Sequence, residues 1–145
     1  YGAHGVWGWD DGTGPAVAHD VNGLAPAWQS VLSLPGAQQV GHLAAFMSGL
    51  AWDRLSPAPG LVVAQPGDEA IGRFVAAGGS GEVALVYIPG GTDVTLNFAP
   101  ALPPATAEWF NPRTGERSPA EAARAGDHLR FATPGEGDWI LQCAY

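Results

Sequence analysis

Lysine is absent from this 145-residue chain, and all of its positive charge comes from six arginines. Against 14 acidic residues, this leaves a formal net charge of −8. Proteins that bind nucleic acid or an anionic membrane need clusters of Lys or Arg to neutralise phosphate groups. The charge balance therefore argues against nucleic acid and against a membrane surface as partners.

Cysteine occurs once, at Cys143, so no intrachain disulfide and no cysteine-based metal site can form. In the stretch DWILQCAY, alternation places Trp139, Leu141 and Cys143 on one face of a predicted strand. We expect a buried, unreactive thiol there. Because His42 has no second histidine four residues further along its predicted helix, no metal site and no cofactor are predicted.

Long apolar runs are missing as well: no stretch approaches the ~20 residues that span a bilayer. The N-terminus shows no targeting segment, and its first residue is Tyr1 rather than Met. We therefore expect this chain to come from a longer protein.

Apolar residues, at 46% of the chain, are plentiful enough for a packed core, and up to about residue 57 their spacing is helical. In LAPAWQSVLSL, Pro26 suits a first helical turn, with Trp28, Val31 and Leu32 on one side. Further on, one face of a predicted amphipathic helix collects Val40, Leu43, Ala44, Met47, Leu50 and Ala51. The stretch LSPAPG, residues 55–60, then predicts a linker.

After the linker, apolar residues alternate with a period of two. Each predicted strand is followed by turn residues such as PGGTD or NPRTGE, whereas SPAEAARAG (118–126) favours one helical turn or an Ω-type loop. Short strands without a long helix favour a β-sandwich. The segments are Leu61–Gln65, Ile71–Ala77, Val83–Ile88, Val94–Phe98, Ala107–Asn111, His128–Ala132 and Asp138–Ala144.

In the opening stretch, YGAHGVWGWDDG, the segment GAHGVWGW predicts a short strand that needs partners to bury its faces. Together with LPGAQQV and LAW, it resembles the closing strand-helix unit of bacterial (β/α)8-barrel glycoside hydrolases of the apiosidase-like group. LVYIPGG, EWFNPRTGE and DWILQ resemble the collagen-binding-type β-sandwich that follows that barrel. The resemblance implies a mainly β chain: residues 1–57 as an incomplete terminal barrel unit, and residues 58–145 as an antiparallel β-sandwich domain.

Such hydrolases use two carboxylates, one as acid/base and one as nucleophile or base. The resemblance implies that both lie on earlier barrel strands, outside this chain, so no catalytic residue is assigned here and the chain alone is not expected to be an enzyme. Asp10 and Asp11 are neighbours whose side chains point apart in an extended segment. A turn, or the positioning of a sugar hydroxyl by Asp10, is the expected role.

Substrate binds at the carboxyl ends of barrel strands, where the resemblance puts His4, Trp7, Trp9 and Asp10. Tryptophan faces stack on sugar rings, and a neutral histidine bonds hydroxyl groups. We expect these residues to line a sugar subsite in the intact enzyme. The alternative is that the aromatic side chains only pack the top of the barrel.

The sequence therefore predicts the C-terminal part of a glycoside hydrolase, in which the sandwich stabilises the barrel. Its partners would be the remainder of the barrel and an oligo- or polysaccharide, and the parent protein is expected to be secreted or periplasmic. Two alternatives stay open. One is a non-catalytic carbohydrate- or collagen-binding module, although Trp109, Tyr87 and Phe74 alternate with apolar neighbours, as core residues do. The other is a structural domain without a ligand.

Overall fold

The computed structural model describes residues 9–15, 18–20, 23–65, 71–98 and 103–145. These divide into two compact units: one of residues up to Gly49 with Arg113–Gly115, and one of Leu50–Pro112 with Glu116–Tyr145. Strand predominates and all named strand pairs are antiparallel, which confirms the predicted mainly β class.

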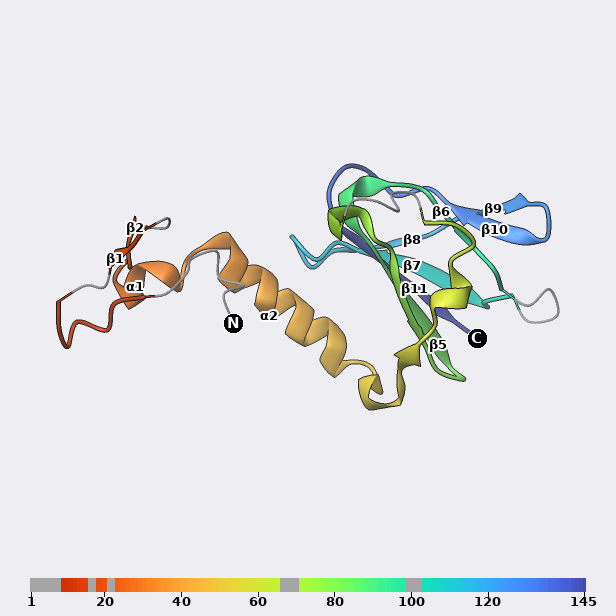
Figure 1. Ribbon diagram of the computed structural model, residues 1–145. Helices are drawn as coiled ribbons and strands as arrows, with labels where there is room; N and C mark the ends of the chain where they lie inside the picture. The colour runs from red at the N-terminus through yellow and green to blue at the C-terminus, as the bar shows by residue number, and fades with distance from the viewer. Residues whose placement is uncertain (1–8, 16–17, 21–22, 66–70, 99–102) are drawn as a thin grey trace. The chain divides into compact units, whose positions relative to one another are not determined.

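The first unit holds the helices α1 (Trp28–Val31) and α2 (Pro35–Ser48), with a small ladder of β1 (Ala18–His19) and β2 (Gly23–Leu24) (Figure 1). Pro35 occupies the first turn of α2, where a missing N–H costs no helical hydrogen bond. Both helices match the predicted helical segments. The predicted barrel strand before them, GAHGVWGW, lies outside the described part of the chain except for its last residue, Trp9.

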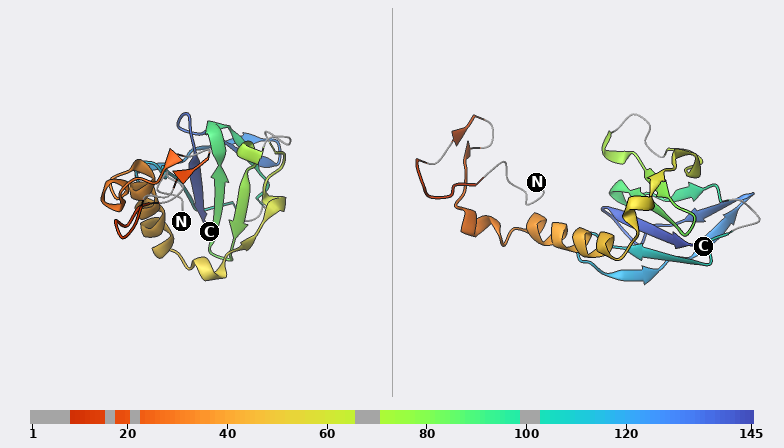
Figure 2. Two further views of the ribbon diagram at one scale, coloured as in Figure 1. Left: turned by 60° about the vertical axis from the view of Figure 1, so that its left-hand side comes forward. Right: turned by 90° about the horizontal axis from the view of Figure 1, so that it is seen from below.

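The second unit is built on a six-stranded sheet of order β3-β4-β5-β11-β7-β8. Strand β11 lies beside β5, as the green and dark blue strands of Figure 2 show. The strands are β3 (Ser56–Pro57), β4 (Ala76–Gly79), β5 (Val83–Ile88), β11 (Trp139–Ala144), β7 (Thr106–Phe110) and β8 (Arg117–Pro119).

A second sheet of three strands has the order β6-β10-β9, formed by Val94–Leu96, His128–Phe131 and Ala122–Ala125. Apolar side chains of the two sheets meet in one cluster, as the alternation predicts. Val86, Leu141 and Cys143 from the larger sheet and Leu96 and Phe131 from the smaller one have no exposed surface. Burial raises the pKa of the Cys143 thiol to about 12, so the group stays protonated, as expected of an unreactive thiol.

Two predicted strands differ from the structure. Leu61–Gln65 follows a 3₁₀ turn at Pro59–Leu61 and keeps only an isolated bridge, Val62 to Leu96. The segment 71–77 begins as a 3₁₀ turn, Ile71–Arg73. The Gln65 side chain then bonds both backbone groups of Val75, at 2.9 and 2.8 Å, taking the place that a neighbouring strand would have filled.

The segment 118–126 also differs, since it forms part of β8 and all of β9 rather than a helical turn or an Ω-loop. Its alanines favour helix, but each half finds a strand partner, β7 for β8 and β10 for β9. His128, at the start of β10, is half-buried, and its buried Nδ1 has no hydrogen-bond partner among the described residues.

Tyr87 joins the end of β5 to the start of β11. Its hydroxyl donates a 2.6 Å hydrogen bond to Asp138 Oδ2, and Gly90 N–H donates to Asp138 Oδ1 at 3.2 Å. Burial, followed by the bond to Asp138 and its charge, raises the pKa of Tyr87 from 10.0 to about 12. The neutral phenol is the form that this contact stabilises.

Trp109 should be essential to the sandwich, because it is only 3% exposed and meets Trp139 edge-on at 6.2 Å. Trp109→Ala should lower the free energy of unfolding by about 3–5 kcal/mol, measured by urea unfolding. Trp52→Ala is the matched control, since Trp52 is 60% exposed. Equal losses in the two variants would contradict the core role of Trp109.

Tyr87→Phe should cost about 1 kcal/mol at pH 7, the usual value of one hydrogen bond. Since the folded-state pKa is the raised one, the wild-type advantage is complete below pH 10.0 and is lost as pH rises through about 12. Urea unfolding of both proteins at pH 7 and above pH 10 measures how far the difference in their free energies of unfolding decreases. An advantage that is constant over this range, or absent at pH 7, would show that the contact does not stabilise the fold.

Candidate functional site

The chain around Asp10 is held to the start of α1 by backbone hydrogen bonds. Asp10 N–H donates to Pro26 O at 2.8 Å, and Trp28 N–H donates to Asp10 O at 2.9 Å, forming a parallel bridge between Asp10 and Ala27. The second bond satisfies one of the N–H groups that a helix N-terminus leaves without an internal partner. Trp9 is therefore fixed close to α1.

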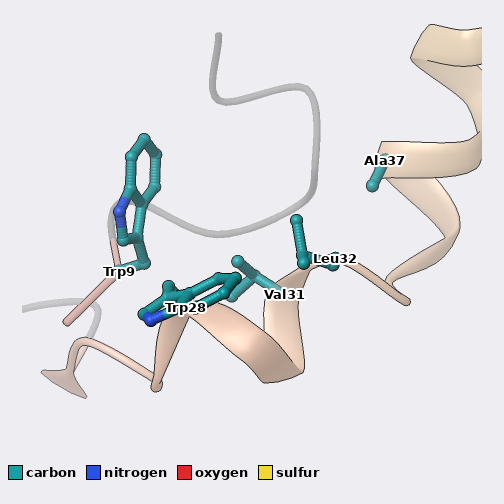
Figure 3. A pocket seen from close by; sticks show the side chains of 5 residues that line it. All are labelled: Trp9, Trp28, Val31, Leu32 and Ala37. Atoms are coloured by element: carbon teal, nitrogen blue, oxygen red, sulfur yellow. The ribbon is translucent and has the colours of Figure 1, made fainter. Parts of the chain in front are cut away.

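Trp9 lines a pocket of about 310 Å³ within the first unit. Figure 3 shows the Trp9 and Trp28 indoles near one another, with Ala37 at the far end of the pocket. The remaining lining residues are Val31 and Leu32, so the walls are almost wholly apolar. Trp9 is 50% and Trp28 42% exposed, which leaves aromatic surface open for contact with a further group.

The aspartates after Trp9 organise the loop. Asp10 Oδ1 accepts the Gly12 N–H at 2.9 Å, and Asp11 Oδ1 accepts both the N–H and the hydroxyl of Thr13, at 2.9 and 2.7 Å. The two hydrogen bonds from Thr13, that of its hydroxyl first and that of its N–H second, lower the pKa of Asp11. Each carboxylate thus makes its own local turn, the arrangement typical of aspartate before Gly or Thr.

Of the four predicted substrate-binding residues, Trp9 lines this pocket. Asp10 follows it in sequence but does not line the pocket. His4 and Trp7 lie outside the described residues. The sequence reasoning missed Trp28 as a site residue and saw it only as part of a helical face. Its spacing with Val31 and Leu32 was the available signal.

The predicted apolar face of α2 is found, but it is open. Val40 is 41% and Leu43 44% exposed, and Ala44 is exposed too. Leu24 and Leu32, elsewhere in the first unit, are also exposed, at 67% and 65%. Exposed apolar side chains gathered on one small unit are typical of an interaction surface.

The sandwich has a pocket of a different kind, about 340 Å³ in volume. It lies between the β7–β8 hairpin and the start of β11, and it is lined by Asn111, Glu116, Arg117, Ser118 and Trp139. The sequence analysis singled out none of these as binding residues. Four of them lie in the β7–β8 hairpin, and the sheet pairing of β7 with β11 brings Trp139 beside them.

The sandwich aromatics follow the prediction in part. Trp109 is a core residue at 3% exposure, whereas Tyr87 and Phe74 are 39% and 54% exposed. The expectation that all three pack inside is therefore wrong for the latter two. Tyr87 lies on the opposite face of β5 from Val86 and Ile88, which is why alternation alone places it outside.

Among the described residues, no group of three or more His, Cys, Asp or Glu side chains could hold a metal ion. None of the helices in that part of the chain has the length and apolarity needed to cross a bilayer.

Comparison with family models gives two matches in consecutive order. Residues 1–54 match "Apiosidase-like, catalytic domain", and residues 57–143 match "Putative collagen-binding domain of a collagenase". Both are the families that the opening stretch and the sandwich segments resemble. A search of curated proteins found no match to the chain.

Solved structures share the fold. A structure titled "Glycoside hydrolase" superposes with a TM-score of 0.72 over 90% of this chain, at 19% identity. A family 5 glycoside hydrolase from Bacteroides vulgatus ATCC 8482 gives a TM-score of 0.66 over 81%, at 18% identity. A Paenibacillus sp. cycloisomaltooligosaccharide glucanotransferase, complexed with cycloisomaltoheptaose, gives 0.64 over 87%, at 12% identity.

The chain spans 30%, 26% and 23% of the lengths of these three proteins, respectively. Its first segment is similar to part of a glycosidase catalytic domain. Through residues 57–143, which are more than half of its length, the chain belongs to the family described as "Putative collagen-binding domain of a collagenase".

Proposed function

We propose that this chain is the C-terminal part of a carbohydrate-cleaving glycoside hydrolase, in which the sandwich is an ancillary, stabilising domain. The match of residues 1–54 to an apiosidase-like catalytic domain carries the proposal. The sandwich match that begins at residue 57, directly after it, supports the same domain order.

In this proposal, the first segment is the closing strand-helix unit of a (β/α)8 barrel whose other units precede Tyr1. The exposed apolar face of α2, with Val40 and Leu43, would be buried against the neighbouring barrel helix and strand. Burial of such side chains is worth about 25 cal/mol per Å² of apolar surface. This need for a partner explains why a unit of this size leaves so much apolar surface open.

The catalytic carboxylates would come from the preceding barrel strands. Asp10 and Asp11 are each engaged in a local turn, as Thr13 and Gly12 show, and they do not face one another across a substrate. Glycoside hydrolysis needs two carboxyl groups on opposite sides of the scissile bond, at a spacing of about 5 Å or more. The contribution of this chain is therefore to binding, not to proton transfer.

Trp9 is the described residue best suited to contact a sugar. It is half exposed beside Trp28, at the start of a segment that the proposal puts at the carboxyl end of the barrel strand. The apolar walls supply a stacking surface, and His4, Trp7 and Asp10 remain the proposed sources of further contacts to the substrate. A packing role for Trp9 against the rest of the barrel is the competing explanation.

A second candidate function is a free-standing binding module. The exposed Tyr87 and Phe74 and the family description favour it. It differs from the main proposal in needing no barrel.

The 145-residue chain by itself should hydrolyse no glycoside, because the proposal places both catalytic carboxylates upstream. The purified 145-residue chain and the full-length protein that contains it should be assayed in parallel for hydrolysis of aryl glycosides and apiose-bearing oligosaccharides. Activity only in the longer protein is the expected result. Reproducible turnover by the isolated chain would refute the proposal that both catalytic carboxylates lie upstream of it.

In the full-length protein, Trp9→Ala should lower kcat/KM about tenfold or more, with a small change in the thermal midpoint. The loss combines an aromatic contact of about 1 kcal/mol with the burial term, and 1.4 kcal/mol corresponds to about a factor of ten. Phe74→Ala is the control, since this exposed aromatic side chain lies in the sandwich, outside the residues that match the catalytic domain. If Trp9→Ala lowers only the midpoint, Trp9 packs the barrel and does not bind substrate.

A further inference from the structure

The two pockets described above differ in chemistry. The pocket at Trp9 is bounded by indole and aliphatic side chains. The sandwich pocket is lined by one aromatic residue, Trp139, and by four polar residues, Asn111, Glu116, Arg117 and Ser118. A single aromatic face surrounded by donors and acceptors matches a sugar, which has apolar C–H faces and a rim of hydroxyl groups.

The Trp139 ring is held in position before any ligand arrives. Its Nε1–H donates to Gly135 O at 2.9 Å, and its ring meets that of Trp109 at 6.2 Å and 72°. Trp109 is buried in the core, so the indole stands on a rigid support. A fixed aromatic platform lowers the entropy that binding would otherwise cost.

The charge of Arg117 is balanced within the sheet. Its Nη1 lies 3.1 Å from Glu108 Oε2 and donates to Gln142 Oε1 at 3.2 Å, while its guanidinium carbon sits 5.8 Å from the Phe110 ring centre. These contacts orient the side chain, and the Glu108 carboxylate offsets its positive charge. With Glu116 also in the lining, the pocket has no excess positive charge to attract an anion.

We propose that this pocket, formed by Asn111, Glu116, Arg117, Ser118 and Trp139, binds a short neutral saccharide by stacking on Trp139. Its volume of about 340 Å³ is at the small end of ligand sites, which suits one or two sugar rings. A collagen triple helix is a long rod of three chains and would need an extended groove. The sandwich would then hold carbohydrate by itself, a role beyond stabilising the barrel.

The test is binding of neutral disaccharides (cellobiose, xylobiose, maltose, isomaltose and laminaribiose) to the 145-residue chain, by saturation-transfer NMR and calorimetry. Ser118→Tyr should abolish binding by filling the pocket, since Ser118 is exposed on the edge strand β8. Thr106→Tyr is the matched control, on an exposed strand position outside the pocket. Asn111→Ala removes one polar contact without filling the pocket and should weaken binding severalfold.

The expected result is that wild type and Thr106→Tyr bind at least one disaccharide equally, with a Kd of about 1 mM or tighter. If no disaccharide binds at a concentration of about 10 mM, ten times the expected Kd, the proposal is wrong. Binding that survives both Ser118→Tyr and Asn111→Ala would overturn it too, as would a pocket-dependent affinity for triple-helical collagen peptide alone. Should Ser118→Tyr fail to fold by urea unfolding, Asn111→Ala decides. Because binding is measured without catalysis, failure here leaves the proposed hydrolase function untouched.

Discussion

Strand β11 is hydrogen-bonded on both sides, to β5 over six residue pairs and to β7 over five, and the rest of the sandwich depends on this double pairing. Leu141 and Cys143, which have no exposed surface, point from it into the core. Its first residue, Trp139, marks the edge of that core and lines the polar pocket. The central strand thus sets both the interior and the proposed binding surface.

The strands that the sequence predicts best are those whose alternation is decided by the core. Val83–Ile88 is found at the predicted bounds, the strand predicted at 107–111 lies one residue earlier at both ends, and the strand predicted at 138–144 begins one residue later. Each carries apolar residues on one face and gains a neighbour on both sides. Local pattern and tertiary pairing agree there, which is why reasoning from the residues succeeds.

Where local preference and pairing disagree, the pattern misleads. Val75 satisfies its backbone through the Gln65 side chain, ten residues away, and no period-two rule anticipates this. Ala122–Ala125 has helix-favouring residues, but β10 offers it a full ladder. The polar pocket could not be predicted either, since Asn111 and Trp139 are distant in sequence and meet only through the sheet. Trp9 could be chosen from sequence because the family resemblance, rather than a pattern, pointed to its position.

Both edges of the six-stranded sheet contain proline: β3 is Ser56–Pro57 and β8 is Arg117–Pro119. Proline has no N–H to offer a further strand, and both edge strands are short. A strand from another molecule that paired with either edge would therefore lack a backbone N–H donor at the proline. A sandwich that ends its sheet in this way carries little risk of edge-to-edge aggregation, even though both edge strands are open to solvent.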